Sequence, residues 1–249
     1  MANVTTRSGI DLNYDAYDKT EQFKILTHGE LSRSIEFYLK DNMSDYSKAL
    51  IVGAGVGLYS AILDQQGVLT TNIEPVLDRF NLLEENTGNN ATNINKACSS
   101  SSGTGTIDYF SDNKSGAQLN TGIGNKSDSV EIITIDSLDL TELDVMVIIA
   151  NGQEVDILKG ATETITNNPD MKIVIYWNYL LNDNEDDYQY LHDNFTPKII
   201  HCDADATTTS LRELGNETYP LTALKAVLES TLLLNWCFLK GSAKHTVGS

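Results

Sequence analysis

Short apolar runs alternate with amphipathic stretches along most of the chain. The runs with the length and composition of strands lie at 49–52, 68–73, 94–98, 106–110, 131–135, 145–150, 172–177, 198–202 and 232–239. Other stretches repeat apolar residues every three or four positions, as helices do. One begins at Glu30, and the others cover 58–65, 76–88, 155–166 and 188–194. Strands that alternate with helices predict an α/β domain with a mostly parallel, doubly wound sheet.

Three segments lack this pattern. Residues 1–20 are polar, and we expect a loose or accessory segment there. Residues 111–128 are rich in Asn, Ser and Gly, which predicts a mobile loop. Residues 241–249 are expected to form a flexible tail. Because no internal repeat or linker divides the rest, residues 21–240 are predicted to form one domain.

The charge, the apolar runs and the cysteines argue against a nucleic-acid-binding, membrane-spanning or disulfide-rich protein. The net charge of −18 would repel a phosphate backbone, so we expect no nucleic acid as a partner. The N-terminus lacks the apolar core of a signal peptide, and no apolar run reaches the length of a membrane span. The 3 cysteines are widely spaced and form neither a disulfide framework nor a C-x-x-C metal site. We therefore expect a cytoplasmic protein with no membrane contact.

A turn of small residues joins the strand at 49–52 to the helix at 58–65. Its sequence from Gly53 to Gly57 is Gly-Ala-Gly-Val-Gly, so the backbone can approach a ligand closely. The turn has neither the spacing of a dinucleotide site nor the Lys-Ser/Thr of a P-loop. Glu74 ends the next strand, where an acid can hold both hydroxyls of a ribose. Each feature alone has an ordinary explanation, a common strand–helix turn or a helix N-terminal acid, but the pair predicts a nucleoside site.

Five segments in order resemble the FkbM family of S-adenosylmethionine-dependent methyltransferases, over about Gly29 to Lys240. They are 52–60, 73–86, 95–97, 134–138 and 152–160. The resemblance implies a Rossmann-like sheet of the class I methyltransferase type, with S-adenosylmethionine as the cofactor. It also implies that the cofactor-binding residues are Gly53, Ala54, Gly55, Gly57, Glu74, Pro75 and Ala97. The implied acceptor is a hydroxyl of a sugar, glycan or other small molecule.

The chain departs from the family pattern at three positions. The family usually has Asp before the first Val-Gly, where this chain has Ile51. The family's block Lys-Ile-Asp-Val-Glu-Gly corresponds to 147–152, so Ile149 stands in place of Asp and Asn151 in place of Glu. The first of these two acids commonly helps to bind the methionyl part of the cofactor, and the second lines the reaction centre. Their loss predicts weaker cofactor binding and removes a catalytic carboxylate.

Three side chains are candidates for a general base that acts on an acceptor hydroxyl: Glu154, Asp136 and His28. Each has a structural interpretation as well. Glu154 can be an exposed helix acid, Asp136 a helix cap and His28 a loop residue. His192 and His201 show no metal-ligand spacing, so we predict no metal site.

The acceptor pocket has candidates of its own. Tyr176, Trp177 and Asn178 end a predicted strand at the edge of the sheet that carries the glycine turn. They can line the pocket for the acceptor, or the aromatic residues can pack in the core and leave Asn178 at the surface.

Three functions follow from these observations. The first is a methyltransferase that acts on a hydroxyl. The second is a degenerate methyltransferase fold that serves as a binding or assembly module, for example as a homo-oligomer, and the isoleucines at 51 and 149 motivate it. The third is a nucleotide-sugar enzyme that uses Glu74 on a different ribose. The pocket for the acceptor is built from variable loops, so the sequence does not name the acceptor.

Overall fold

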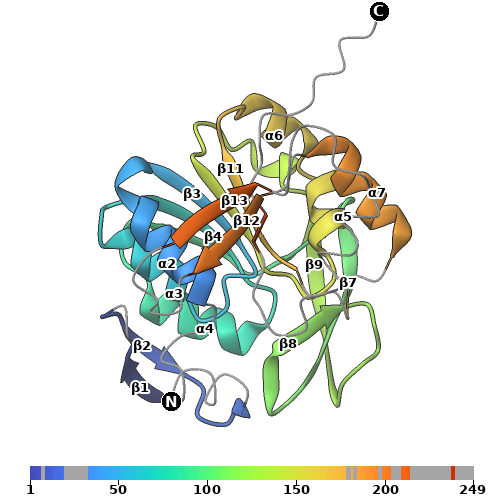
Figure 1. Ribbon diagram of the computed structural model, residues 1–249. Helices are drawn as coiled ribbons and strands as arrows, with labels where there is room; N and C mark the ends of the chain where they lie inside the picture. Colours follow the sequence, from blue (N-terminus) through green and yellow to red (C-terminus); the bar gives the residue numbers. More distant parts are fainter. Residues whose placement is uncertain are drawn as a thin grey trace, which may run out of the picture.

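The computed structural model describes residues 1–6, 9–19, 33–177, 181, 184–195, 198–202, 209–213 and 237–238. An eight-stranded sheet forms its centre (Figure 1). From one edge to the other its strands are β13 (Thr209–Glu213), β12 (Lys198–Cys202), β14 (Cys237–Phe238), β11 (Lys172–Tyr176), β10 (Val145–Ile148), β3 (Lys48–Val52), β4 (Leu69–Ile73) and β5 (Ala91–Ile94).

The five strands from β11 to β5 are parallel to their neighbours, whereas β14 is antiparallel to both β11 and β12. Strand β13 is antiparallel to β12 at the edge of the sheet. The prediction of a mostly parallel, doubly wound sheet is therefore confirmed. In this register Val52 pairs with Ile73 on one side and with Ile148 on the other. The segments that follow β3, β4 and β10 consequently meet beyond the carboxyl ends of these central strands.

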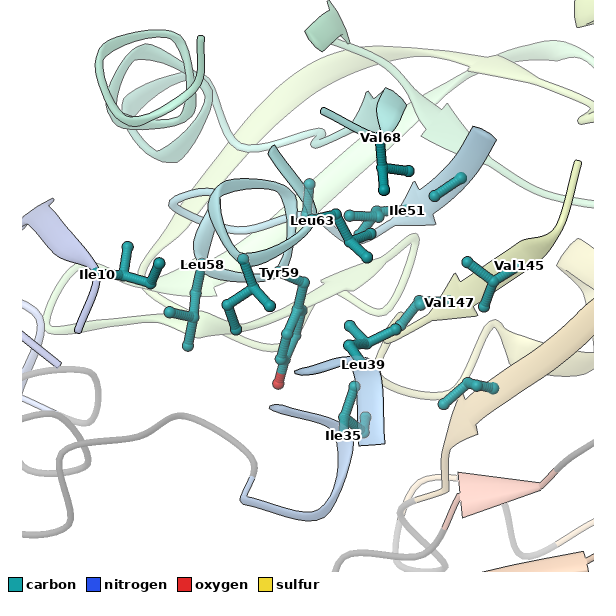
Figure 2. Close-up of a cluster of buried hydrophobic side chains, with 14 of the residues drawn as sticks. Ile10, Ile35, Leu39, Ile51, Leu58, Tyr59, Leu63, Val68, Val145 and Val147 are labelled. Atoms are coloured by element: carbon teal, nitrogen blue, oxygen red, sulfur yellow. The ribbon is translucent and has the colours of Figure 1, made fainter. Parts of the chain in front are cut away.

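Helices cover both faces of this sheet, as the predicted alternation requires. Helices α2 (Arg33–Asn42), α3 (Leu58–Asp64) and α4 (Leu77–Asn86) pack on one face, and α5 (Glu154–Lys159), α6 (Thr162–Asn167) and α7 (Glu185–Asn194) pack on the other. Alternate strand residues serve the two faces, since Ile51 and Val147 belong to one apolar cluster while Leu50 and Met146 belong to the other. Figure 2 shows Ile51 and Val147 with side chains from α2 and α3.

A second sheet replaces the loop that the sequence predicted over 111–128, so this prediction is wrong. Its strands, in order, are β6 (Ala97–Cys98), β9 (Lys126–Ile133), β7 (Gly103–Phe110) and β8 (Asn113–Leu119). Strands β8 and β9 pair with β7 on either side. Ile107, Leu119 and Val130 from these three strands belong to one small cluster of buried apolar side chains. Few apolar residues are needed because only one face of this sheet is covered, so the polar composition concealed the strands.

The expected strand at 94–98 is divided between the two sheets, because β5 ends at Ile94 and β6 begins at Ala97. The expected helix over 155–166 is likewise divided, into α5 and α6. The division occurs at Gly160, where a Cβ would collide with the carbonyl of Ser99. Two short 3₁₀ turns, Met43–Asp45 and Asp136–Leu138, precede β3 and β10.

Residues 1–20 contain a hairpin that the sequence pattern did not reveal. Strands β1 (Ala2–Thr5) and β2 (Asp11–Tyr14) pair antiparallel. Leu12 and Tyr14 are buried in the core cluster beneath α4. The side-chain oxygen of Asn86 accepts the N–H of Asn13 at 2.7 Å, and its amide donates to the carbonyl of Asn13 at 2.7 Å. Two buried side chains in a short hairpin are too few to produce a recognisable alternation.

Several predicted features lie outside the described residues, namely the start of the helix at Glu30, most of the strand at 232–239 and the tail at 241–249. The division of the chain at residues 20 and 240 stays a prediction. In the part of the chain that the structure describes, no helix has the length and apolar character to span a membrane.

We predict that Asn168→Ala lowers the free energy of unfolding by about 2–3 kcal/mol, because it leaves buried backbone groups unpaired. The buried amide of Asn168 accepts the N–H of Leu143 at 2.8 Å and donates to the carbonyls of Leu140 at 3.1 Å and Thr164 at 2.7 Å. These bonds fix the segment that enters β10. Urea denaturation measures the change. The neighbouring exposed Asn167 is the matched control, and its replacement by Ala should change stability by less than about 0.5 kcal/mol. Equal effects of the two substitutions would contradict this role.

Candidate functional site

The turn after β3 depends on its three glycines. Gly53, Gly55 and Gly57 have φ angles of 77°, 61° and 95°, in the left-handed region that disfavours other residues. A Cβ on Gly53 would collide with the carbonyl of Ile149, and one on Gly55 would collide with the guanidinium of Arg79. Gly57 precedes α3 and lies against α4. The turn thus presents backbone without side chains at Gly53 and Gly55, at the carboxyl ends of β3, β4 and β10.

Glu74 directly follows β4, at the carboxyl end of the strand, and its side chain accepts a hydrogen bond from the glycine turn. Its side chain is only 4% exposed. One carboxylate oxygen accepts the N–H of Gly55 at 2.8 Å, and the other accepts the N–H of Val76 at 3.0 Å. Burial raises the pKa of Glu74, while the charge of Arg79 and these two N–H groups oppose the rise. The carboxylate therefore joins the turn to the start of α4.

A cleft opens between the glycine turn and β8, and it has two lobes. The first lobe holds about 640 Å³ of empty space, part of it open to solvent, and its walls include Glu74, Pro75, Ala97 and Gln153. The second lobe lies beside Ala54, Gly55, Tyr59 and Tyr176. The lining that both lobes share consists of Gly53, Arg79, Ser115, Ile149 and Asn151.

Most of the residues predicted to bind the cofactor lie together in this cleft. Gly53, Glu74, Pro75 and Ala97 line the first lobe, and Gly53, Ala54 and Gly55 line the second. Gly57 lies behind them at the start of α3. That these residues bind a cofactor stays a prediction, but the sheet register brings them to one place as expected.

The three residues predicted to line the acceptor pocket have different placements in the structure. Tyr176 lines the second lobe. Trp177 is buried in the core, where its ring centroid lies 5.8 Å from that of Tyr188. Asn178 lies outside the described residues. Of the two candidates that the structure describes, Tyr176 is placed where an acceptor could touch it and Trp177 is not.

The candidate bases are held away from the cleft lining or are not described. Glu154 is 0% exposed, so its interpretation as an exposed helix acid is wrong. Its two carboxylate oxygens accept the N–H groups of Ala150 at 3.0 Å and Gly152 at 2.9 Å. This arrangement fixes the turn after β10. Sequence reasoning could not distinguish it from an acid that faces solvent.

Asp136 caps a helix, in agreement with its structural interpretation. Its carboxylate accepts the N–H of Thr164 at 2.7 Å and that of Glu163 at 3.1 Å, at the start of α6. His28 lies outside the described residues. Within the described part of the chain, no group of three or more His, Cys, Asp or Glu side chains is arranged to hold a metal ion.

The three departures from the family pattern have distinct surroundings. Ile51 is fully buried in the core, and Ile149 gives both lobes an apolar surface. Asn151 adopts a φ of 48° and donates its amide to the carbonyls of Ser115 at 2.9 Å and Ala117 at 3.0 Å. Strand β8 is at the edge of its sheet, so these carbonyls need donors from elsewhere. An ionised Glu or Asp offers no donor, whereas an amide provides two.

Sequence reasoning missed the cations of the first lobe, which are Arg79, Lys96 and Lys114. Arg79 could have been found, because it lies three residues after Val76 and four before Leu83 on the apolar face of α4. A charged residue on such a face needs a partner or a function. Lys114 had no comparable signal, since its strand was predicted to be a loop.

Comparisons with known proteins agree with this geometry. A family model described as the methyltransferase FkbM domain matches residues 52–214. A comparison with curated proteins gives no match. Among solved structures, the chain resembles the methyltransferase FkbM from Methylobacillus flagellatus KT with a TM-score of 0.50 and 14% identity. The match covers 92% of this chain and only 56% of that protein.

A TehB-like SAM-dependent methyltransferase from Corynebacterium glutamicum ATCC 13032 Kitasato also has a TM-score of 0.50, at 12% identity, with coverage of 92% of this chain and 96% of that one. At such low identities these structures establish the class I methyltransferase fold and nothing more specific. The family match spans more than half of the chain and includes the glycine turn, Glu74 and the second sheet. On this evidence the chain belongs to the FkbM methyltransferase domain family.

Proposed function

We propose that this protein is an S-adenosylmethionine-dependent methyltransferase that methylates a hydroxyl of a sugar or glycan. The observation that carries the proposal is the buried carboxylate of Glu74, which is fixed by the N–H of Gly55 at the floor of the cleft. A carboxylate in this place, beside a turn without side chains, suits a nucleoside whose ribose hydroxyls need acceptors. The family match and the fold support the cofactor class.

The residues of the cleft fit the parts of S-adenosylmethionine. Glu74 would hold the ribose, and the apolar side of the first lobe, which includes Ile73, Ile107 and Leu119, would receive the adenine. At Gly53 and Gly55 the place of a Cβ is taken by the Ile149 carbonyl and the Arg79 guanidinium, so the turn would present backbone groups to the methionyl part. Apolar walls with a few polar groups are typical of small-molecule sites.

The chemistry asks little of the protein beyond alignment. When bound, the cofactor supplies a methyl group already activated on its sulfonium. The chain must then orient the acceptor hydroxyl and exclude water. Tyr59, Ser115 and Tyr176 surround the second lobe with groups that can hydrogen-bond to hydroxyls. Both oxygens of Glu154 and of Asp136 accept backbone N–H groups, so we assign the general base to neither acid.

Asn151 joins the two elements that form one wall of the second lobe, β8 and the segment after β10. Its amide bonds to Ser115 and Ala117 hold the edge of β8 against the end of β10. Ser115 and Asn151 line both lobes, so these bonds lie in the wall of the cleft. We therefore interpret the change from the family's Glu to Asn151 as an adaptation to the adjacent strand edge.

We predict that Glu74→Gln weakens the binding of S-adenosylhomocysteine by about 10- to 100-fold, the range expected when a charged acceptor is lost. Gln keeps the size of the side chain but has a single acceptor oxygen for the N–H groups of Gly55 and Val76, so melting temperatures without ligand check that the turn is retained. Isothermal titration measures the affinity, and adenosine monophosphate and a nucleotide sugar are titrated as competitors. Glu142→Gln serves as the control, because Glu142 is exposed and pairs with Lys48 at the opposite end of the sheet.

Failure of the wild-type protein to bind S-adenosylhomocysteine at millimolar concentration would refute the proposed cofactor. That result, together with a stable oligomer or partner, would favour a non-catalytic assembly module. Displacement of the ligand by a nucleotide sugar at lower concentration would favour a nucleotide-sugar enzyme.

We predict that Asn151→Asp, which restores an acid at the family's position, lowers the free energy of unfolding by about 2–3 kcal/mol and does not improve cofactor binding. The carboxylate would face two carbonyl oxygens without a donor. Asn151→Gly is the control, since it permits the positive φ and removes the amide without adding charge. Urea denaturation and titration with S-adenosylhomocysteine provide the measurements. Wild-type stability together with tighter binding in Asn151→Asp would show that the amide has no such role.

A further inference from the structure

The cleft gathers cations although the chain carries a net charge of −18. Lys96 is 2.6 Å from a carboxylate oxygen of Glu131. Lys114 lies 2.8 Å from Asp15 and 2.6 Å from Asp78. Both ammonium groups are thus held by carboxylates at short range. Arg79 differs from them, because it lines both lobes and packs against the glycine turn.

Arg79 presents its guanidinium to the turn. The side chain starts from α4 and is 8% exposed. A Cβ on Gly55 would collide with Nη2 of Arg79, so the glycine at this position makes room for the guanidinium. Nη1 lies 3.7 Å from the carboxylate of Asp18 on the other side. The planar group therefore lies between Asp18 and the backbone of the glycine turn.

Asp18 comes from the N-terminal segment and contacts both Arg79 and β8. It is 0% exposed, and its carboxylate accepts the N–H of Ser115 at 3.1 Å. The next residue, Lys19, donates its backbone N–H to the carbonyl of Asp112 at 2.8 Å. Asp18 consequently connects β8 to Arg79, and it does so from outside the region that the family model matches.

The methionyl end of the proposed cofactor carries a carboxylate that must leave water when it binds. A buried carboxylate needs hydrogen-bond donors, and a guanidinium provides them in a planar fork. Lys96 and Lys114 line only the first lobe, whereas Arg79 lines both lobes and packs against the glycine turn. Because Glu74 and Asp18 already flank Arg79, the interaction must come from directed hydrogen bonds and not from surplus positive charge. Arg79 is the cation beside the turn that can form them.

We propose that Arg79 binds the carboxylate of the cofactor's methionyl group and that Asp18 is the residue that positions Arg79 for this contact. The inference rests on the proposed function, since it presupposes that S-adenosylmethionine occupies the cleft. It extends the cofactor site to the N-terminal segment at 9–19. It also gives this chain a way to hold the methionyl group that does not need an acid at Ile149.

The test compares two ligands that differ only in this carboxylate. S-adenosylhomocysteine and its decarboxylated analogue are titrated against the full chain by calorimetry. The wild-type protein should bind S-adenosylhomocysteine about 10-fold or more tightly, as expected for a charge-assisted hydrogen bond. Arg79→Gln should remove this preference and leave the affinity for the analogue within about threefold. Asp18→Asn should reduce the preference, and Lys19→Gln should keep it, because the exposed Lys19–Asp112 pair lies on the same segment.

The outcomes separate the two proposals. A wild-type protein that binds neither ligand overturns the proposed function and this inference together. A wild-type protein that binds both ligands equally, or an Arg79→Gln variant that weakens both equally, overturns the role of Arg79 and leaves the cofactor in place. If Arg79→Gln does not fold, loss of the preference in Asp18→Asn supports the proposal, and an unchanged preference contradicts it. Melting temperatures without ligand show which variants fold.

Discussion

The hydrogen bond from the Gly55 N–H to the carboxylate of Glu74 is the interaction on which the rest of the cleft depends. Ala54 and Val56 of the turn are buried in the core, and between them the backbone of Gly55 is held by this bond. The parallel register of β3 and β4 brings the turn and Glu74 together, and the second oxygen of Glu74 binds the start of α4. Burial of this carboxylate is unfavourable, and two backbone donors and the nearby Arg79 offset that cost.

Three parts of the chain that are distant in sequence meet at strand β8, on the side of the cleft opposite the glycine turn. Strand β8 contributes Ser115 and its neighbours, and its free edge is satisfied by side chains. The carboxylate of Asp18 accepts from the Ser115 N–H, and the amide of Asn151 donates to two carbonyls of the strand. An edge strand would otherwise present unpaired groups to solvent or to other chains. Ser115 and Asn151, which take part in these contacts, line both lobes of the cleft.

The sequence allowed the sheet, the glycine turn and Glu74 to be predicted, because each depends on local pattern. Continuous apolar strands and a Gly-Ala-Gly-Val-Gly turn admit few other conformations. Strand β8 and the part of β9 before Glu131 could not be predicted, since their pairing is between distant segments and buries few side chains. The burial of Glu154 and the amide role of Asn151 were hidden for a related reason. Both depend on backbone groups whose positions are known only after the fold is formed. The methyltransferase resemblance gave the correct family, while the acceptor stays a proposal.

The most direct test of the account is a crystal structure of the protein with S-adenosylhomocysteine. The account predicts the ribose hydroxyls within hydrogen-bond distance of Glu74, with the homocysteine part over the glycine turn. The sulfur should face the lobe that contains Tyr176. A ligand bound elsewhere, or a ribose turned away from Glu74, would contradict the account.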